Sequence, residues 1–162
     1  MSTAALDTVS DGSSPRRLAP ILWGLLALFV LRVVGQALVV FFHVRWLPPA
    51  REWYSGLIAY PLLLPAQSLI IALLAFVCRD FTRGRGWFVM PRPRLGRWVS
   101  ALGIVYFSAM VVRYATWMTL HPEARWLHGT IPILLHCVLA MFLIVFGRYH
   151  LRSVASTKGA AA

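Results

Sequence analysis

The amino-acid sequence predicts an all-α, polytopic membrane protein with four transmembrane helices in an up-down bundle and both termini in the cytoplasm. Three observations support this prediction. Apolar residues make up 59% of the 162 residues, and the mean hydropathy is +0.70. These residues gather in four runs of about 20 residues or more, each long enough to cross a hydrocarbon core roughly 30 Å thick. Basic residues are concentrated on alternate connections, as in multi-pass membrane proteins.

The chain begins with a polar segment and then an apolar run. Residues 1–18 are small and polar, which predicts a disordered cytoplasmic tail. The first run, 19–42, is too long for the core of a signal peptide and precedes no small-residue cleavage site, so we expect an uncleaved signal anchor. The second run, 57–78, contains Pro61 and Pro65. Two prolines four residues apart predict a kink or a broken first turn at the start of this helix.

The remaining apolar runs are 98–120 and 129–149, and each can span the membrane. The segment 79–97 between the second and third runs is predicted to be a basic cytoplasmic loop. Residues 151–162 are predicted to form a second cytoplasmic tail. The transmembrane domain is therefore expected over residues 19–150.

The basic residues give the orientation. Only Arg45, Arg51 and Arg125 fall on one side of the predicted membrane. Because basic residues are retained in the cytoplasm, the other side is predicted to be cytoplasmic. Arginine supplies all but one of the 16 basic residues, which is typical of a GC-rich bacterial genome and indicates the bacterial inner membrane. The basic residues of the predicted cytoplasmic side are Arg16, Arg17, Arg79, Arg83, Arg85, Arg92, Arg94, Arg97, Arg148, Arg152 and Lys158.

The net charge of +11 could indicate a nucleic-acid-binding protein. The charges, however, lie between apolar runs, where retention in the cytoplasm and attraction to anionic headgroups explain them. We therefore expect the lipid bilayer as the partner and no nucleic acid. The predicted contacts with anionic lipid are Arg79, Arg83, Arg85, Arg92, Arg94 and Arg97.

Five polar residues inside the runs form the candidate site: Arg32, Gln36, Gln67, Arg113 and His136. Gln36, Arg113 and His136 lie about 10 Å from the outer end of their spans, and Arg32 and Gln67 lie about 15 Å from it, at about 1.5 Å per residue. They are predicted to share one layer. No Asp or Glu lies within any span to neutralise the two arginines.

The face of the fourth run that carries His136 also carries Gly129, Ala140 and Gly147. A stripe of small residues allows two helices to approach closely in a membrane. This face is therefore expected to turn toward the rest of the bundle.

Two interpretations of the polar layer remain open. Its residues can be structural, with hydrogen bonds between helices that satisfy groups which lipid cannot. Alternatively, they form a cationic pocket, open to the outer leaflet, for an anionic lipid, a carboxylate or a quinone oxygen, since a guanidinium offers a fork of donors. Arg32 fits the structural interpretation least well, because no carboxylate lies at its depth.

Haem was considered because facing histidines can ligate it between membrane helices. The histidines are His43, His121, His128, His136 and His150. Only His136 is deep, and the height mismatch of about 10 Å disfavours two axial ligands. No cofactor is therefore expected, and a b-type haem protein is kept as a further alternative.

Chemistry-bearing motifs are not found in the sequence. No grouping of His, Asp and Glu at metal-ligand spacing, nucleophile–base pair or nucleotide motif can be assembled. No metal is therefore predicted, and nothing specific in the sequence supports an enzymatic activity. Cys78 and Cys137 are predicted to lie more than about 10 Å apart in depth, too far for a disulfide.

Three segments carry a family resemblance: Trp-Tyr-Ser-Gly-Leu-Ile-Ala-Tyr-Pro at 53–61, Gly-Thr-Ile-Pro-Ile-Leu-Leu-His at 129–136 and Gly-Arg-Tyr-His at 147–150. They resemble small bacterial four-helix integral membrane proteins without an assigned role. The resemblance covers about residues 20–150 and implies an architecture but no activity. Similarity to DoxX-like proteins extends only to the number of spans and an arginine in the first span.

The sequence as a whole favours a structural or accessory subunit of a bacterial inner-membrane system, which would bind another membrane protein or a second copy of itself. Binding of an anionic lipid or small ligand in the cationic pocket is the alternative. In the first function the polar layer would contact protein, and in the second it would contact a bound ligand.

Overall fold

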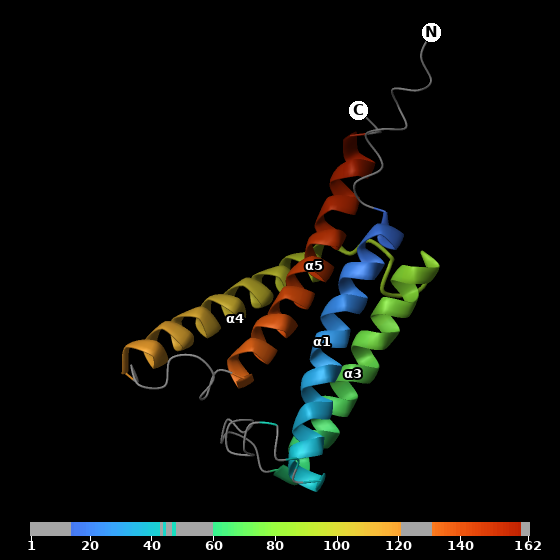
Figure 1. The fold of residues 1–162 in the computed structure, drawn as a ribbon. Coiled ribbons are helices and arrows are strands. Elements are labelled where there is room, and N and C mark those ends of the chain that lie inside the picture. Colours follow the sequence, from blue (N-terminus) through green and yellow to red (C-terminus); the bar gives the residue numbers. More distant parts are fainter. Residues whose placement is uncertain (1–13, 43, 45–46, 48–59, 121–130, 160–162) are drawn as a thin grey trace.

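The computed structural model describes residues 14–42, 44, 47, 60–120 and 131–159. Each of its four helices is long and apolar enough to cross a membrane, which confirms the all-α, four-span fold class. The long apolar segments favour membrane helices because each has the length and apolar composition that a hydrocarbon core requires. The helices are α1 (Pro15–Phe42), α3 (Tyr60–Arg83), α4 (Pro93–Leu120) and α5 (Ile131–Gly159) (Figure 1).

The helices continue beyond the predicted spans at one end of the molecule. α3 continues to Arg83, and α5 continues to Gly159. The apolar run ends where the hydrocarbon ends, but a helix made of residues with good helix propensity can extend further into the interface. Both prolines of α3 lie within the helix, whose first turn is not broken. The predicted segments 43–59 and 121–130, with Gly129, lie outside the described residues except for positions 44 and 47.

One end of the bundle holds the 84–92 connection, the start of α1 and the end of α5; we call it the loop end (Figure 1). α5 packs against both α1 and α4, and α1 packs against α3. The main apolar core lies near the loop end, where Leu22, Cys78 and Phe81 are fully buried and Phe142 is 2% exposed. Figure 1 shows α4 leaning away from α1 and α3, so the four helices do not close around one axis.

The crossing of α4 and α5 depends on small residues. Gly96, Ser100 and Gly103 are the buried residues of α4, and they face α5 at Ala140 and Gly147. A Cβ added at Gly96 would lie 2.8 Å from the Gly147 carbonyl oxygen, and one at Gly103 would lie 3.1 Å from that of Ala140. The two backbones are thus in near contact. The predicted inward orientation of Ala140 and Gly147 is confirmed, since both are buried.

Large apolar side chains cover the outside of the helices. Leu31 on α1, Leu69 on α3 and Val105 on α4 are 69%, 72% and 67% exposed in the isolated chain. Such a surface is unfavourable in water and suited to hydrocarbon. The two cysteines are free thiols.

Candidate functional site

Three of the five predicted site residues form one hydrogen-bonded group between α1 and α3. The Arg32 guanidinium donates through Nη1 to the Gln36 side-chain carbonyl, one turn further along α1. The Gln67 amide of α3 donates to the same oxygen at 3.4 Å. Gln36 is fully buried and Gln67 is 5% exposed. The four-residue spacing of Arg32 and Gln36 puts both on one face of α1.

His136 connects this layer to α4. Its Nδ1 and the Tyr106 hydroxyl lie 2.6 Å apart, within a hydrogen bond whose direction depends on the histidine tautomer. The positive charges of Arg113 and Arg32 both lie within electrostatic range of the imidazole. Polar side chains thus form two hydrogen-bonded groups, one between α1 and α3 and one between α4 and α5. Tyr106 was not among the predicted site residues, although it lies two helical turns before Arg113 and so shares its face.

Arg113 differs from the other four residues in its surroundings. It is exposed on α4, in a stretch from residue 104 to 120 in which no side chain is buried. Arg32, in contrast, is half-buried beside a groove. The two arginines of the predicted layer therefore face different environments.

An apolar groove of about 720 Å³ runs between α1 and α5. Among the described residues that line the groove, Arg32 is the only charged one. The remaining lining residues are apolar or carry a thiol: Leu25, Leu28, Leu31, Val34, Gly35, Leu38, Leu47, Leu134, Leu135, Cys137, Val138 and Met141. Volumes of roughly 300–1,000 Å³ with few polar groups are typical of small-ligand sites.

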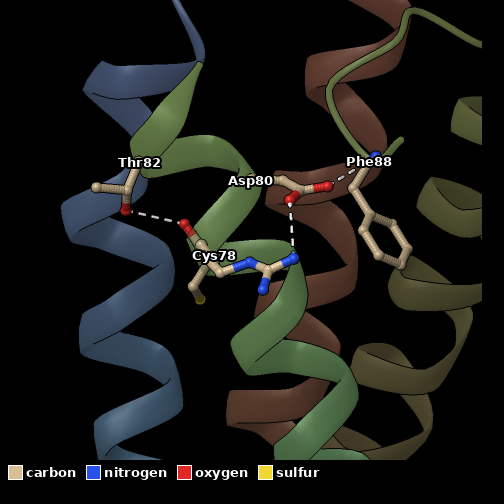
Figure 2. A network of polar contacts seen from close by, with 5 residues as sticks. Cys78, Asp80, Thr82 and Phe88 are labelled. Atoms are coloured by element: carbon tan, nitrogen blue, oxygen red, sulfur yellow. Dashed lines mark hydrogen bonds and ion pairs between the residues drawn. The ribbon is translucent and has the colours of Figure 1, made fainter. Parts of the chain in front are cut away.

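The predicted basic loop is partly helix and partly a folded turn. Asp80, which is 8% exposed, lies at the end of α3 and accepts a hydrogen bond from the Phe88 backbone N–H at 3.4 Å. Arg79 lies 3.9 Å from the same carboxylate (Figure 2). The Thr82 hydroxyl donates to the Cys78 carbonyl, also in Figure 2, and accepts from the Trp23 indole at 3.0 Å. Asp80 is not among the site residues predicted from the sequence. Its position as the single acidic residue among the arginines of 79–97 could have indicated a structural role for its carboxylate.

Two glycines allow the chain to turn at this point. Gly84 and Gly86 have φ values of 64° and 134°, which side chains rarely permit. A Cβ at Gly86 would overlap the carboxylate of Asp80. Gly86 is therefore required for two reasons: its φ value is one that side chains rarely adopt, and a Cβ there would overlap Asp80.

Aromatic side chains close the loop end over the core. Phe81 packs edge-on against Tyr149, with ring centroids 4.7 Å apart, and Phe88 packs against Phe146 at 6.3 Å. The Tyr149 hydroxyl donates to the Val89 carbonyl at 2.9 Å, which attaches the loop to α5. These contacts attach the predicted cytoplasmic loop to α3 and α5 at the loop end.

The six arginines predicted to contact anionic lipid fall into different settings. Arg79 pairs with Asp80, and Arg92 lies 3.8 Å above the Trp87 ring. Arg94 and Arg97 line a surface hollow of about 440 Å³ with Trp98 and Ala101 on α4. Arg83 and Arg85 are exposed.

Metal and haem sites were also considered. No group of three His, Cys, Asp or Glu side chains occurs in the part of the chain that the structure describes. His136 and His150 lie on the same helix, about 21 Å apart along its axis at about 1.5 Å per residue. The other three histidines lie outside the described residues, so the expectation of no cofactor and the alternative of a b-type haem protein are both untested.

No protein-family model, curated protein or solved structure matches this chain. The resemblance to small four-helix membrane proteins therefore stays a prediction. Function has to be argued from the grooves and the charges that line them.

Proposed function

We propose that this chain is a multi-pass protein of the bacterial inner membrane that binds an amphiphile in the α1–α5 groove. The acidic or carbonyl head of the ligand would accept hydrogen bonds from Arg32, and its apolar body would fill the groove. The observation that carries the proposal is that Arg32 alone, of the described lining residues, brings a charge to an apolar groove of about 720 Å³.

The energetics of an intramembrane charge support this role. A charged side chain at the centre of a bilayer costs roughly 2.5–3.5 kcal/mol even by the most favourable scales. The bond from Arg32 to Gln36, which is fixed in turn by Gln67, holds the guanidinium at the groove wall. A ligand oxygen beside Arg32 would offset the cost of its charge with charge-assisted hydrogen bonds.

The depth of Arg32 narrows the ligand class. Arg32 lies about 15 Å from the Phe42 end of α1, well below the headgroups, at about 1.5 Å per residue. The phosphate of an ordinary bilayer lipid would have to leave the interface to reach it. A carboxylic acid that enters in its protonated form, or a quinone carbonyl, is uncharged and reaches this depth at a lower desolvation cost. These two chemistries share an oxygen acceptor on a long apolar body.

For the orientation, we propose that both termini and the loop end face the cytoplasm. Ten arginines of the described helices and their connection lie toward this end: Arg16, Arg17, Arg79, Arg83, Arg85, Arg92, Arg94, Arg97, Arg148 and Arg152. Such an excess favours cytoplasmic retention. A Trp87→Cys variant should be labelled by a membrane-impermeant thiol reagent only after cells are opened. Labelling of this cysteine from the periplasm of intact cells would show that the loop end faces the periplasm, and it would refute the proposed orientation.

The ligand proposal is tested by extracting small molecules from the purified protein. Wild-type protein, isolated in a mild detergent, should carry a hydrophobic acid or quinone that mass spectrometry quantifies. The Arg32→Gln variant should retain less than a tenth of it, since hydrogen bonds to a charged group contribute about 1.5–3 kcal/mol. Arg113→Gln is the matched control, because it removes an intramembrane arginine outside the groove lining.

A second pair of variants tests the groove itself. Met141→Trp adds bulk to the groove lining, whereas Leu69→Trp adds the same bulk on the exposed face of α3. Met141→Trp should reduce the bound ligand and Leu69→Trp should not. Equal ligand content in all four variants and the wild type would refute the proposal.

A second function, that of an accessory subunit, is supported by the far half of α4. No side chain from residue 104 to 120 is buried, and Arg113 lies there within a membrane span. A photocrosslinker at Val112 should give a single protein adduct in membranes, while one at Leu69 should give none. Similar crosslinking at both positions would argue against a specific partner on α4.

A further inference from the structure

A hollow of about 440 Å³ lies on the surface of α4 near the loop end, lined by Arg94, Arg97, Trp98 and Ala101. These residues lie on the opposite side of the helix from Gly96, Ser100 and Gly103, which contact α5. At about 100° per residue, Trp98 is roughly 160° from Gly96 around the helix. The hollow therefore faces away from the protein, toward the surrounding lipid.

The two arginines of the hollow are exposed and have no protein partner within the described residues. Neighbouring arginines are already engaged, since Arg79 pairs with Asp80 and Arg92 stacks on Trp87. Arg94 and Arg97 are three residues apart on one helix face, so their guanidiniums can act on one anion. Two converging guanidiniums suit a phosphate, whose oxygens accept bidentate hydrogen bonds.

An apolar track leads from the hollow toward the membrane interior. Trp98 is 78% exposed, and Leu102, Val105 and Val112 on the same face are 60%, 67% and 64% exposed. The small side chain of Ala101 leaves room beside the Trp98 ring. An indole at this level is typical of the membrane interface, where its ring contacts acyl chains and its N–H meets headgroups.

We propose that this hollow, the α4 hollow, is a binding site for an anionic phospholipid. The phosphate would lie between Arg94 and Arg97, and an acyl chain would follow the face of Trp98 and Val105. A phospholipid, and not a soluble phosphate compound, is indicated because the charges stand directly above an exposed apolar face. The site is separate from the Arg32 groove and does not depend on it.

Lipid titration of the full-length protein in detergent, read by native mass spectrometry, tests the proposal. Phosphatidylglycerol should bind more tightly than phosphatidylcholine with the same acyl chains. The double variant Arg94→Gln/Arg97→Gln should bind phosphatidylglycerol about thirtyfold more weakly, at about fivefold per arginine. Arg83→Gln/Arg85→Gln is the matched control: it removes the same charge from exposed arginines outside the hollow and should weaken binding less than threefold.

Two further measurements distinguish a specific phospholipid site from non-specific electrostatic attraction and from binding of phosphate alone. Ala101→Trp keeps both arginines but fills the hollow, and it should weaken phosphatidylglycerol binding at least tenfold. Inorganic phosphate at millimolar concentration should not displace the lipid. Equal losses in the two double variants, no effect of Ala101→Trp, or displacement by inorganic phosphate would each overturn the proposal.

Discussion

Replacing Gly147 with Ala should destabilise the protein by forcing α4 and α5 apart. A Cβ at this position would lie 2.7 Å from the Ser100 backbone nitrogen and 2.9 Å from the Gly96 carbonyl oxygen, and it would overlap the Ser100 hydroxyl. Carbon atoms in good contact are about 3.5–4.0 Å from their neighbours. Two of the three obstructing atoms belong to the α4 backbone, so no side-chain rotation relieves the overlap. The helices would have to separate by roughly 0.7–1 Å.

The magnitude follows from two opposing effects. A separation of this size forfeits about a quarter to a half of each dispersion contact along the crossing, and overpacking typically costs about 1–3 kcal/mol. Alanine also stabilises a helix by up to about 1 kcal/mol relative to glycine. Gly24→Ala supplies the matched control, since a Cβ at Gly24 meets nothing within 4 Å. Gly147→Ala should therefore have a free energy of unfolding about 1–3 kcal/mol below that of Gly24→Ala.

Unfolding in mixed micelles with increasing SDS, followed by circular dichroism, measures this difference. A larger residue should increase the effect, so Gly147→Leu should be less stable than Gly147→Ala. If Gly147→Ala and Gly24→Ala unfold at the same SDS fraction, the close crossing of α4 and α5 is not a source of stability. The reasoning about α4 would then be refuted.

Three other substitutions test separate contacts by the same unfolding measurement. Gly86→Ala should lower the free energy of unfolding by about 2 kcal/mol, because φ is 134° there and the new Cβ would overlap Asp80. A free energy of unfolding equal to that of the wild type would contradict the requirement for glycine in this turn. Tyr106→Phe removes the 2.6 Å contact with His136 and should cost about 0.6 kcal/mol. A loss above 2 kcal/mol would show that more than one hydrogen bond depends on this hydroxyl. Phe81→Ala empties a fully buried core position and should cost about 3–5 kcal/mol. A loss below 1 kcal/mol would show that the loop-end core is not as well packed as the structure indicates.

Hydropathy predicted the four helices because transfer of long apolar runs into hydrocarbon dominates their energetics. It could not predict where α3 ends, since the last turn of that helix is held by contacts with segments distant in sequence. The Trp23 indole donates to Thr82, and the Arg16 guanidinium donates to the Arg83 carbonyl at 3.4 Å. A sequence pattern that treats residues 79–97 as one basic loop contains no information on these contacts.

Small residues that favour close helix packing occur on both α4 and α5. The sequence predicts the stripe of α5 from Ala140 and Gly147, and α4 carries a matching set in Gly96, Ser100 and Gly103. Their spacing of four and three residues places all three on one face. Such a stripe is common in membrane helix pairs, so the pairing of α4 with α5 could have been proposed from sequence.

The candidate site shows why depth along a helix is not enough to assign a role to an intramembrane charge. Arg32 and Arg113 lie at similar predicted depths, and the sequence offers no carboxylate for either within a span. In the structure, Arg32 lies between a buried glutamine pair and an apolar groove, whereas Arg113 is exposed on a helix half without buried side chains. Contact with lipid is unfavourable for both charges. The two arginines therefore call for different partners: a small ligand held in the groove for Arg32, and another protein or the interface for Arg113.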